Sequence, residues 1–167
     1  MKRIVALVLA LTAIFVFASC NVLQELKPYE GQDKVFQKEG LTMTLTDAFE
    51  EKPVEGYTAC YEALYVAVYL LKEPFSAFAG FENYTIEEYE QLILKANASK
   101  NPASSKLDGV PVMEYTFKNE DTGVTYQYFA VMHKGSDGFF LVQFACAQEY
   151  YGEYKSHFEA WAKSIQV

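Results

Sequence analysis

Alternation of apolar and polar residues along the chain predicts its first strands. From Leu41 to Thr46, apolar residues alternate with threonines, and a period of two is typical of a half-buried β-strand. A shorter strand is expected just before it, at Val35 to Gln37, with Gly40 in the turn between the two. The pattern therefore predicts two neighbouring strands at the start of the folded region.

The run from Thr58 to Lys72 is apolar and aromatic, and its pattern fits two kinds of structure. Tyrosines recur within it every four residues, a spacing that would also suit one face of a helix. Enrichment in β-branched and aromatic residues favours strands instead. We therefore expect two strands, joined by a turn or bulge near Ala63 and ended by Pro74.

Three more strands are expected, at Val110 to Lys118, Thr125 to Lys134 and Phe139 to Cys146. Asn119 to Gly123 and Gly135 to Gly138 contain the turn residues of hairpins, so these strands should form an antiparallel meander. The last strand is apolar on both faces. A sheet with two apolar faces needs cover on both.

Two helices are expected to supply that cover. Thr85 to Glu88 has the form of a capping box and opens a segment with one apolar face. A last helix carries Glu159 and Lys163 as an exposed pair four residues apart. The apolar stripe of this last helix consists of Tyr154, Phe158, Trp161 and Ile165. Asn97 to Ser105 is expected to be a loop. The order of strands, helix, strands and helix, without βαβ alternation, predicts an α+β domain with a mainly antiparallel sheet flanked by helices on both faces.

The first 20 residues have the pattern of an export signal. Two basic residues precede the apolar stretch from Ile4 to Phe17, and the small pair Ala18-Ser19 leads to Cys20. The apolar stretch is too short to span a bilayer, which takes about 20 apolar residues. A cysteine at the cleavage point resembles the lipobox of bacterial lipoproteins, although Phe17 departs from the usual leucine.

This resemblance implies a signal peptide at 1–19 and a lipidated N-terminus and tether at 20–33. The remaining chain, 34–167, has the length of a single domain. Cys20 is then the lipid attachment site, and two acyl chains suffice for stable attachment. The expected location is a cell membrane, with the domain on the extracytoplasmic side. Simple secretion and an uncleaved anchor are the alternatives.

Charge and cysteine content limit the partners. Without the two basic residues of the leader, 12 of the 14 basic residues remain against 22 acidic ones, which gives a net charge of −10. Such a chain is unsuited to nucleic acid or to anionic lipid head groups. Cys60 and Cys146 would permit a disulfide in an oxidising compartment, but both lie in apolar runs where a free cysteine is equally at home.

The order of several packing and turn features resembles the superfamily that includes the PsbP subunit of photosystem II and the DcrB-like bacterial lipoproteins. None of these features is a catalytic signature. The resemblance implies an α/β/α sandwich that serves chiefly as a non-catalytic binding or assembly module. The stretches that carry it are Gly40 to Leu45, Glu73 to Phe75, Asp108-Gly109, Val112 to Phe117, Phe140 to Phe144 and Phe158 to Ile165.

Motifs for catalysis or metal binding are absent from the sequence. His133 and His157 are the two histidines, and we expect each to be an ordinary surface or boundary residue. There is no His-Glu-x-x-His, no Cys/His cluster and no Gly-x-Ser-x-Gly, so we expect no metal and no cofactor. An envelope hydrolase whose groups converge from distant positions stays the alternative to a module that binds an envelope protein or a small ligand.

An aromatic segment stands out between the strands and the first helix. Phe75, Phe78, Phe81 and Tyr84 recur every three residues in a stretch otherwise rich in Gly, Ala and Ser. Such rings can pack beneath a loop as a small satellite core. The alternative is a partly exposed patch that binds a protein, a peptide or a glycan.

Overall fold

The computed structural model describes residues 27–167, so the predicted leader and Cys20 lie outside the described residues. The described chain forms a seven-stranded sheet, a two-stranded hairpin, two α-helices and several short 3₁₀ turns. The strands are β1 (Asp33–Lys38), β2 (Leu41–Thr46), β3 (Glu50–Lys52), β4 (Ala59–Ala63), β5 (Val66–Pro74), β6 (Ala103–Leu107), β7 (Val110–Lys118), β8 (Thr125–Lys134) and β9 (Gly138–Ala147). The helices are α1 (Ile86–Ala96) and α2 (Tyr151–Lys163).

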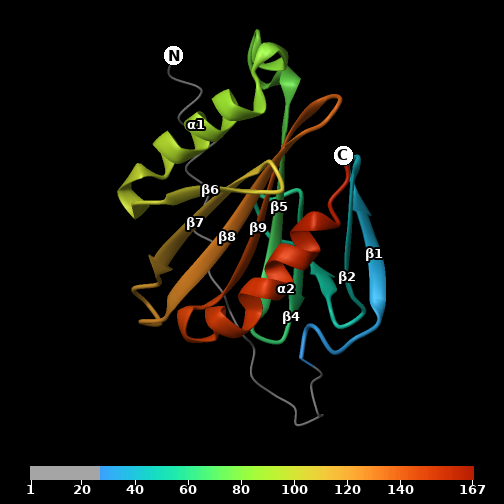
Figure 1. Cartoon of the computed structure of the whole chain (residues 1–167), viewed down its shortest axis with the longest axis vertical. Coiled ribbons are helices and arrows are strands. Elements are labelled where there is room, and N and C mark those ends of the chain that lie inside the picture. The colour runs from blue at the N-terminus through green and yellow to red at the C-terminus, as the bar shows by residue number, and fades with distance from the viewer. Residues whose placement is uncertain (1–26) are drawn as a thin grey trace.

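The large sheet has the strand order β3-β4-β5-β9-β8-β7-β6, and every neighbouring pair is antiparallel (Figure 1). The two predicted strands around Ala63 are confirmed as β4 and β5, and the predicted meander is confirmed as β7, β8 and β9. Strands β1 and β2 form a separate hairpin with the turn at Gly40. The expected fold class is therefore present.

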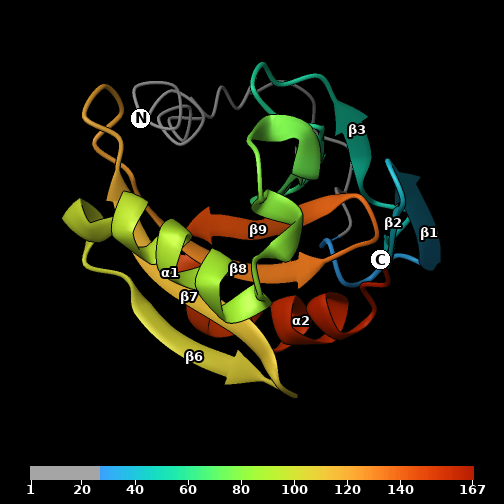
Figure 2. The same ribbon diagram turned by 90° about the horizontal axis from the view of Figure 1, so that it is seen from above.

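Both faces of the sheet are apolar and both are covered. Along β9, Phe139 and Leu141 face one core cluster, whereas Phe140, Val142 and Phe144 face the other. This alternation follows from the two-residue period of a strand. Figure 2 shows the sheet from above with the helices packed on it.

Helix α1 covers the first face. Tyr89 and Ile93 are buried against it, together with Phe81 from the preceding segment. The predicted capping box is confirmed, because the Glu88 amide donates to Thr85 Oγ1 at 3.1 Å and the Thr85 amide donates to Glu88 Oε2 at 2.8 Å. These two bonds satisfy backbone donors that the first helical turn leaves free.

Helix α2 and the β1–β2 hairpin cover the second face. The predicted stripe of Tyr154, Phe158, Trp161 and Ile165 is buried there, and the apolar positions of β2 pack beside it. Lys163 forms an ion pair with Asp108 instead of the expected pair with Glu159. Asp108 lies in the turn between β6 and β7, which reaches this end of α2.

One secondary-structure prediction was wrong. The segment expected to be a loop at 97–105 overlaps the start of strand β6 (Ala103–Leu107), which pairs with β7 along its whole length. Its side chains are exposed except for Leu107, which is partly buried against the α2-face core, so this edge strand shows no alternation. The short edge strand β3 was also not foreseen, for the same reason.

The two ends of the large sheet carry different connections. We call one the entry end, because residue 27, where the described chain begins, lies near it; it comprises the turns at 64–65 and 119–124 and residues 148–150. We call the other the far end, with the turns at 108–109 and 135–137 and the aromatic segment 75–84. Helix α2 runs from the entry end to the far end (Figure 1).

Candidate functional site

A cavity of about 120 Å³ lies at the far end, between the end of α2 and the turn from β6 to β7. Three polar residues line it: Asp108, His133 and Lys163. The remaining walls are apolar and consist of Leu107, Val110, Val131, Ala162 and Ile165. Strands β6, β7 and β8 and helix α2 all contribute, so the site is formed only by the tertiary fold.

His133 reaches the cavity from the end of β8. It lies two residues after Val131, so strand geometry points both side chains to the α2 face of the sheet. Burial lowers the pKa of His133 below its ordinary value, and the imidazole is therefore neutral at pH 7. Its Nε2 atom is buried without a hydrogen-bond partner among residues 27–167. This nitrogen can therefore accept a hydrogen bond from a molecule that enters the cavity, or donate one to it.

The mouth of the cavity carries an exposed ion pair. Lys163 Nζ lies 3.1 Å from Asp108 Oδ2, and at least half of each side chain is exposed. Asp108 and Gly109 form a tight turn in which both residues have a positive φ, of 50° and 90°. An exposed ion pair contributes little to stability. Its two charges are therefore available for exchange with a charged ligand.

The lining of the cavity combines apolar walls with a few polar groups. The cavity holds a neutral imidazole, but no serine, threonine, tyrosine or cysteine lines it. The hydroxyl and thiol nucleophiles of common hydrolases are therefore missing from this lining. Apolar walls with a few convergent polar groups are typical of small-molecule sites.

The predicted aromatic segment lies on the other face of the same end, packed around one buried ring. Phe81 is 2% exposed, Phe78 stacks on it with ring centroids 4.2 Å apart, and Tyr84 meets its edge at 5.7 Å. Phe75 packs edge-on against Phe139 at 5.3 Å. Phe81 is thus unavailable to a partner, whereas Phe75, Phe78 and Tyr84 are half-buried and keep part of their surface in solvent.

Lys134 fixes the backbone of this segment from β8. Its Nζ atom donates to the carbonyl oxygens of Glu82 and Tyr84 at 2.9 and 2.7 Å, and it lies over the rings of Phe75 and Phe139. Hydrogen bonds from a charged donor are stronger than neutral ones. The segment is therefore held onto the sheet by a cation as well as by its rings.

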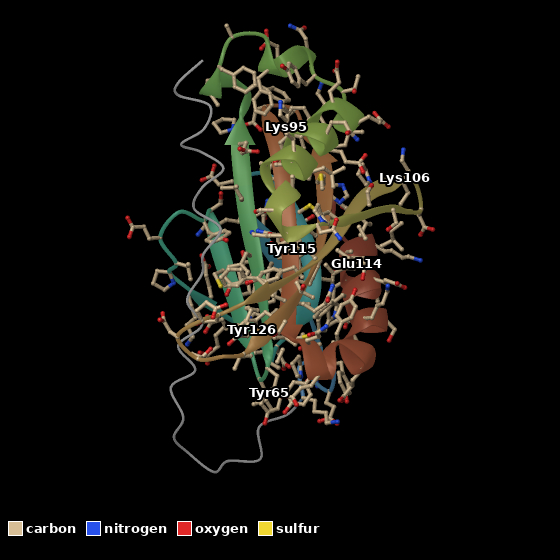
Figure 3. The ribbon with its side chains drawn as sticks, turned by 90° about the vertical axis from the view of Figure 1, so that its left-hand side faces the viewer. Tyr65, Lys95, Lys106, Glu114, Tyr115 and Tyr126 are labelled. Carbon is tan, nitrogen blue, oxygen red and sulfur yellow. The ribbon has the colours of Figure 1, made fainter. Side chains whose placement is uncertain are left out.

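A buried polar group also lies near the middle of the α1 face. The Gln143 side chain is fully buried, and its Oε1 atom accepts from the Tyr115 hydroxyl at 2.7 Å. Tyr57 lies near this amide, but the Gln143 Nε2 atom has no partner in hydrogen-bonding geometry within residues 27–167. Figure 3 shows Tyr115 near the centre of this side. This amide is therefore part of the protein interior.

The two cysteines of the domain do not form a disulfide. Cys60 and Cys146 are both free, and they belong to core clusters on opposite faces of the sheet. Burial raises the pKa of each thiol to about 12. Both are therefore protonated at neutral pH and unsuited to redox or nucleophilic roles.

The second histidine lies apart from the cavity. His157, at the middle of α2, stacks on Tyr29 with ring centroids 4.2 Å apart. The structure thus does not bring the two histidines together. Within residues 27–167, three or more potential metal ligands never gather in one place, and neither helix has the length and apolar character needed to cross a bilayer.

Sequence reasoning missed the cavity because its polar residues lie far apart along the chain. Asp108 and His133 are 25 positions apart, and Lys163 follows 30 positions later. The one available signal was the tight turn at Asp108-Gly109, which had been noted only as a packing feature. Of the residues predicted to be functional, Cys20 lies outside the described residues.

Comparison with known proteins supports the fold. No protein-family model and no curated protein matches this chain. The chain is similar to the solution structure of cyanobacterial PsbP (CyanoP) from Synechocystis, with a TM-score of 0.54 and 11% identity over 90% of this chain and 98% of that chain. It is also similar to a crystal structure from Bacteroides thetaiotaomicron, with a TM-score of 0.51 and 16% identity over 82% of this chain and 48% of that chain. At these identities the likeness concerns the fold alone, and the fold is PsbP-like.

Proposed function

We propose that the chain is a lipoprotein, anchored through Cys20 on the extracytoplasmic side of a cell membrane, that works as a non-catalytic binding module. The observation that carries the binding role is the far-end cavity, where apolar walls and the His133 ring lie beneath an exposed ion pair. The leader pattern that ends at Cys20 supports the anchor. The PsbP-like fold supports a module by analogy only.

The size of the cavity limits what it can bind. Its volume of about 120 Å³ is well below the range of about 300–1,000 Å³ that is typical for drug-sized ligands. A small organic molecule, or one apolar side chain of an envelope protein, fits this volume. Because Lys163 and Asp108 offer both signs of charge at the mouth, a charged head group on an apolar body matches the site.

A thermal-shift screen tests the binding role. Small organic acids, amino acids and short peptides are added to the mature domain and to Ala162→Phe, which fills the cavity. We expect a compound that raises the melting temperature of the parent and leaves the variant unchanged. Lys163→Ala, a change at an exposed position, serves as a second variant in case Ala162→Phe does not fold. Equal shifts in all three proteins would contradict the proposal.

Cell fractionation tests the anchor. The full chain is expected in the membrane fraction and should be released by Cys20→Ala. Cys60→Ala replaces a cysteine by alanine in the domain and serves as the matched control, which should stay with the membrane. A full chain that is soluble, or a Cys20→Ala chain that stays membrane-bound, would contradict an anchor at Cys20.

One observation favours a second function. His133 shares its cavity with the carboxylate of Asp108, an arrangement that a water-activating hydrolase would also need. Hydrolysis of small esters or amides above the buffer rate, lost in His133→Gln and retained in His157→Gln, would favour an envelope hydrolase. The binding proposal predicts no such activity.

A further inference from the structure

The first described residues are fixed to the start of α2. The Glu153 carboxylate accepts hydrogen bonds from Lys27 Nζ at 2.8 Å and from the Tyr29 hydroxyl at 2.6 Å. The Tyr29 ring stacks on His157 with an interplanar angle of 5°. These residues belong to the stretch expected to be a tether, yet they pack against the domain.

The chain stays attached to the domain up to β1. Pro28 is buried, and the Thr46 hydroxyl donates to its carbonyl oxygen. The Gln32 amide donates to Asp47 Oδ1 at 2.9 Å. A Cβ atom at Gly31 would lie 2.4 Å from the same oxygen, so the backbone passes too close to β2 for a larger residue. Residues 27–33 are therefore part of the domain and do not act as a tether.

The remaining tether is short. Seven residues lead from Cys20 to Lys27, and an extended chain covers at most about 3.5 Å per residue. A lipid on Cys20 therefore holds Lys27 within about 25 Å of its attachment point. The entry end, which adjoins Lys27, is therefore held within reach of the membrane surface.

The entry end exposes aromatic and apolar side chains. Tyr65 is 44% exposed and stacks on Tyr150 with ring centroids 4.9 Å apart, and Val124 is 37% exposed. Tyr65 also has a φ of 64°, in the left-handed region that is unfavourable for a tyrosine. Figure 3 shows Tyr65 at the opposite end of the molecule from Lys106, which lies near the cavity. Tyrosine is enriched where proteins meet the membrane–water interface.

We propose that the entry end rests on the lipid surface, with Tyr65 and Tyr150 in the interfacial region. This inference depends on the proposed function, because it takes Cys20 as the lipid-bearing residue. The short tether keeps the surface at a high effective concentration, so weak contacts suffice. Helix α2 has 13 residues and thus spans about 20 Å. The cavity lined by His133 lies at the far end of this helix and therefore faces away from the lipid.

The charges at the entry end indicate which lipid head groups it can contact. Glu62, Asp121 and Glu149 lie there without an ion pair among the described residues, whereas Lys27 and Lys118 are paired with carboxylates. An acidic surface is repelled by anionic head groups. The partner is therefore a zwitterionic lipid surface, and anionic lipid should weaken the contact.

Hydrogen exchange on vesicles tests the orientation independently of cellular lipidation. Residues 20–167 are coupled through the Cys20 thiol to a maleimide lipid in phosphatidylcholine vesicles. Cys60 and Cys146 are fully buried, so they do not compete for the reagent. We expect amides at 119–124 and 148–150 to exchange about tenfold more slowly than in the uncoupled protein, and amides at 108–109 and 135–137 to be unchanged.

Two variants and one lipid change sharpen the test. Tyr65→Ser combined with Tyr150→Ser should remove the protection, whereas Val35→Ser, at an exposed apolar position on β1, should keep it. Replacing a third of the lipid by phosphatidylserine should reduce the protection of the entry-end amides. Equal exchange at both ends, or protection at the far end, would overturn the inference. A native chain without lipid would instead overturn the proposed function, so the two failures are distinguishable.

Discussion

Both ends of the large sheet are rich in aromatic rings, but the central ring is buried at the far end, whereas the rings at the entry end contact solvent. At the far end, Phe81 is buried among neighbouring rings beneath the segment that precedes α1. At the entry end, Tyr65 and Tyr150 stack on each other in contact with solvent. A ring that is surrounded stabilises the fold, whereas a ring that is exposed is free to contact another surface.

The contrast teaches that aromatic content alone does not locate a binding surface. The chain has 13 tyrosines and 13 phenylalanines, and most of them lie in the two cores. The two ends differ in the segments that cover their rings. The far end has a helix and a long segment to cover it, and the entry end has tight turns and the clamped N-terminal chain.

The largest expected effect comes from Phe81→Ala, which tests whether the rings at the far end are part of the hydrophobic core. Removing a buried phenylalanine should lower the free energy of unfolding by about 3 to 5 kcal/mol. Urea denaturation measures it, with Tyr65→Ala as the matched aromatic truncation at the entry end. A loss for Phe81→Ala no larger than that for Tyr65→Ala would remove the distinction between the ends.

A smaller effect is expected from Tyr29→Ala, which tests the clamp at the entry end. Losing the stack on His157 and the bond to Glu153 should lower the free energy of unfolding by about 1 kcal/mol. Tyr29→Phe keeps the ring and should lose less. If neither variant changes the denaturation midpoint, the clamp does not form in solution.

Tyr65→Gly should act in the opposite direction. Glycine adopts a positive φ without a steric cost, so the variant should gain about 0.5 kcal/mol of stability despite the lost stacking. Differential scanning calorimetry of the soluble domain is the measurement. A clear loss of stability would show that Tyr65 is needed by the fold itself and would weaken its role at a lipid surface.

The smallest effect concerns pH and separates the two histidines. Because burial lowers the pKa of His133 in the folded state, the unfolded chain binds its proton more readily. Stability should therefore be full above the ordinary histidine pKa and should fall as pH drops from there toward the folded-state value. His133→Gln should lessen this decline between pH 7 and pH 5, and His157→Gln serves as the control. Identical pH profiles for the parent and His133→Gln would contradict the burial of the imidazole.

Much of the fold was predictable because its signals are local. Alternation marked β2, turn residues marked the β7–β8 and β8–β9 hairpins, and Thr85 marked the start of α1. Strand β6 was missed because an edge strand is held by backbone bonds to its neighbour, and its side chains need no pattern.

The candidate site was not predictable from local signals. His133 looks like an ordinary strand-end residue until α2 packs over the sheet and brings Lys163 and Asp108 to the same cavity. The clamp of Tyr29 on α2 likewise joins positions more than a hundred residues apart. Contacts of this kind depend on tertiary packing, and a period of two or 3.6 residues carries no trace of them.

The most direct test of the central claim is the intact mass of the native chain extracted from the membranes of cells that make it. An anchored module predicts a chain that begins at Cys20 and carries the added mass of a diacylglyceryl group. A chain that still begins at Met1, or one that begins at or beyond Cys20 without lipid, would contradict the account.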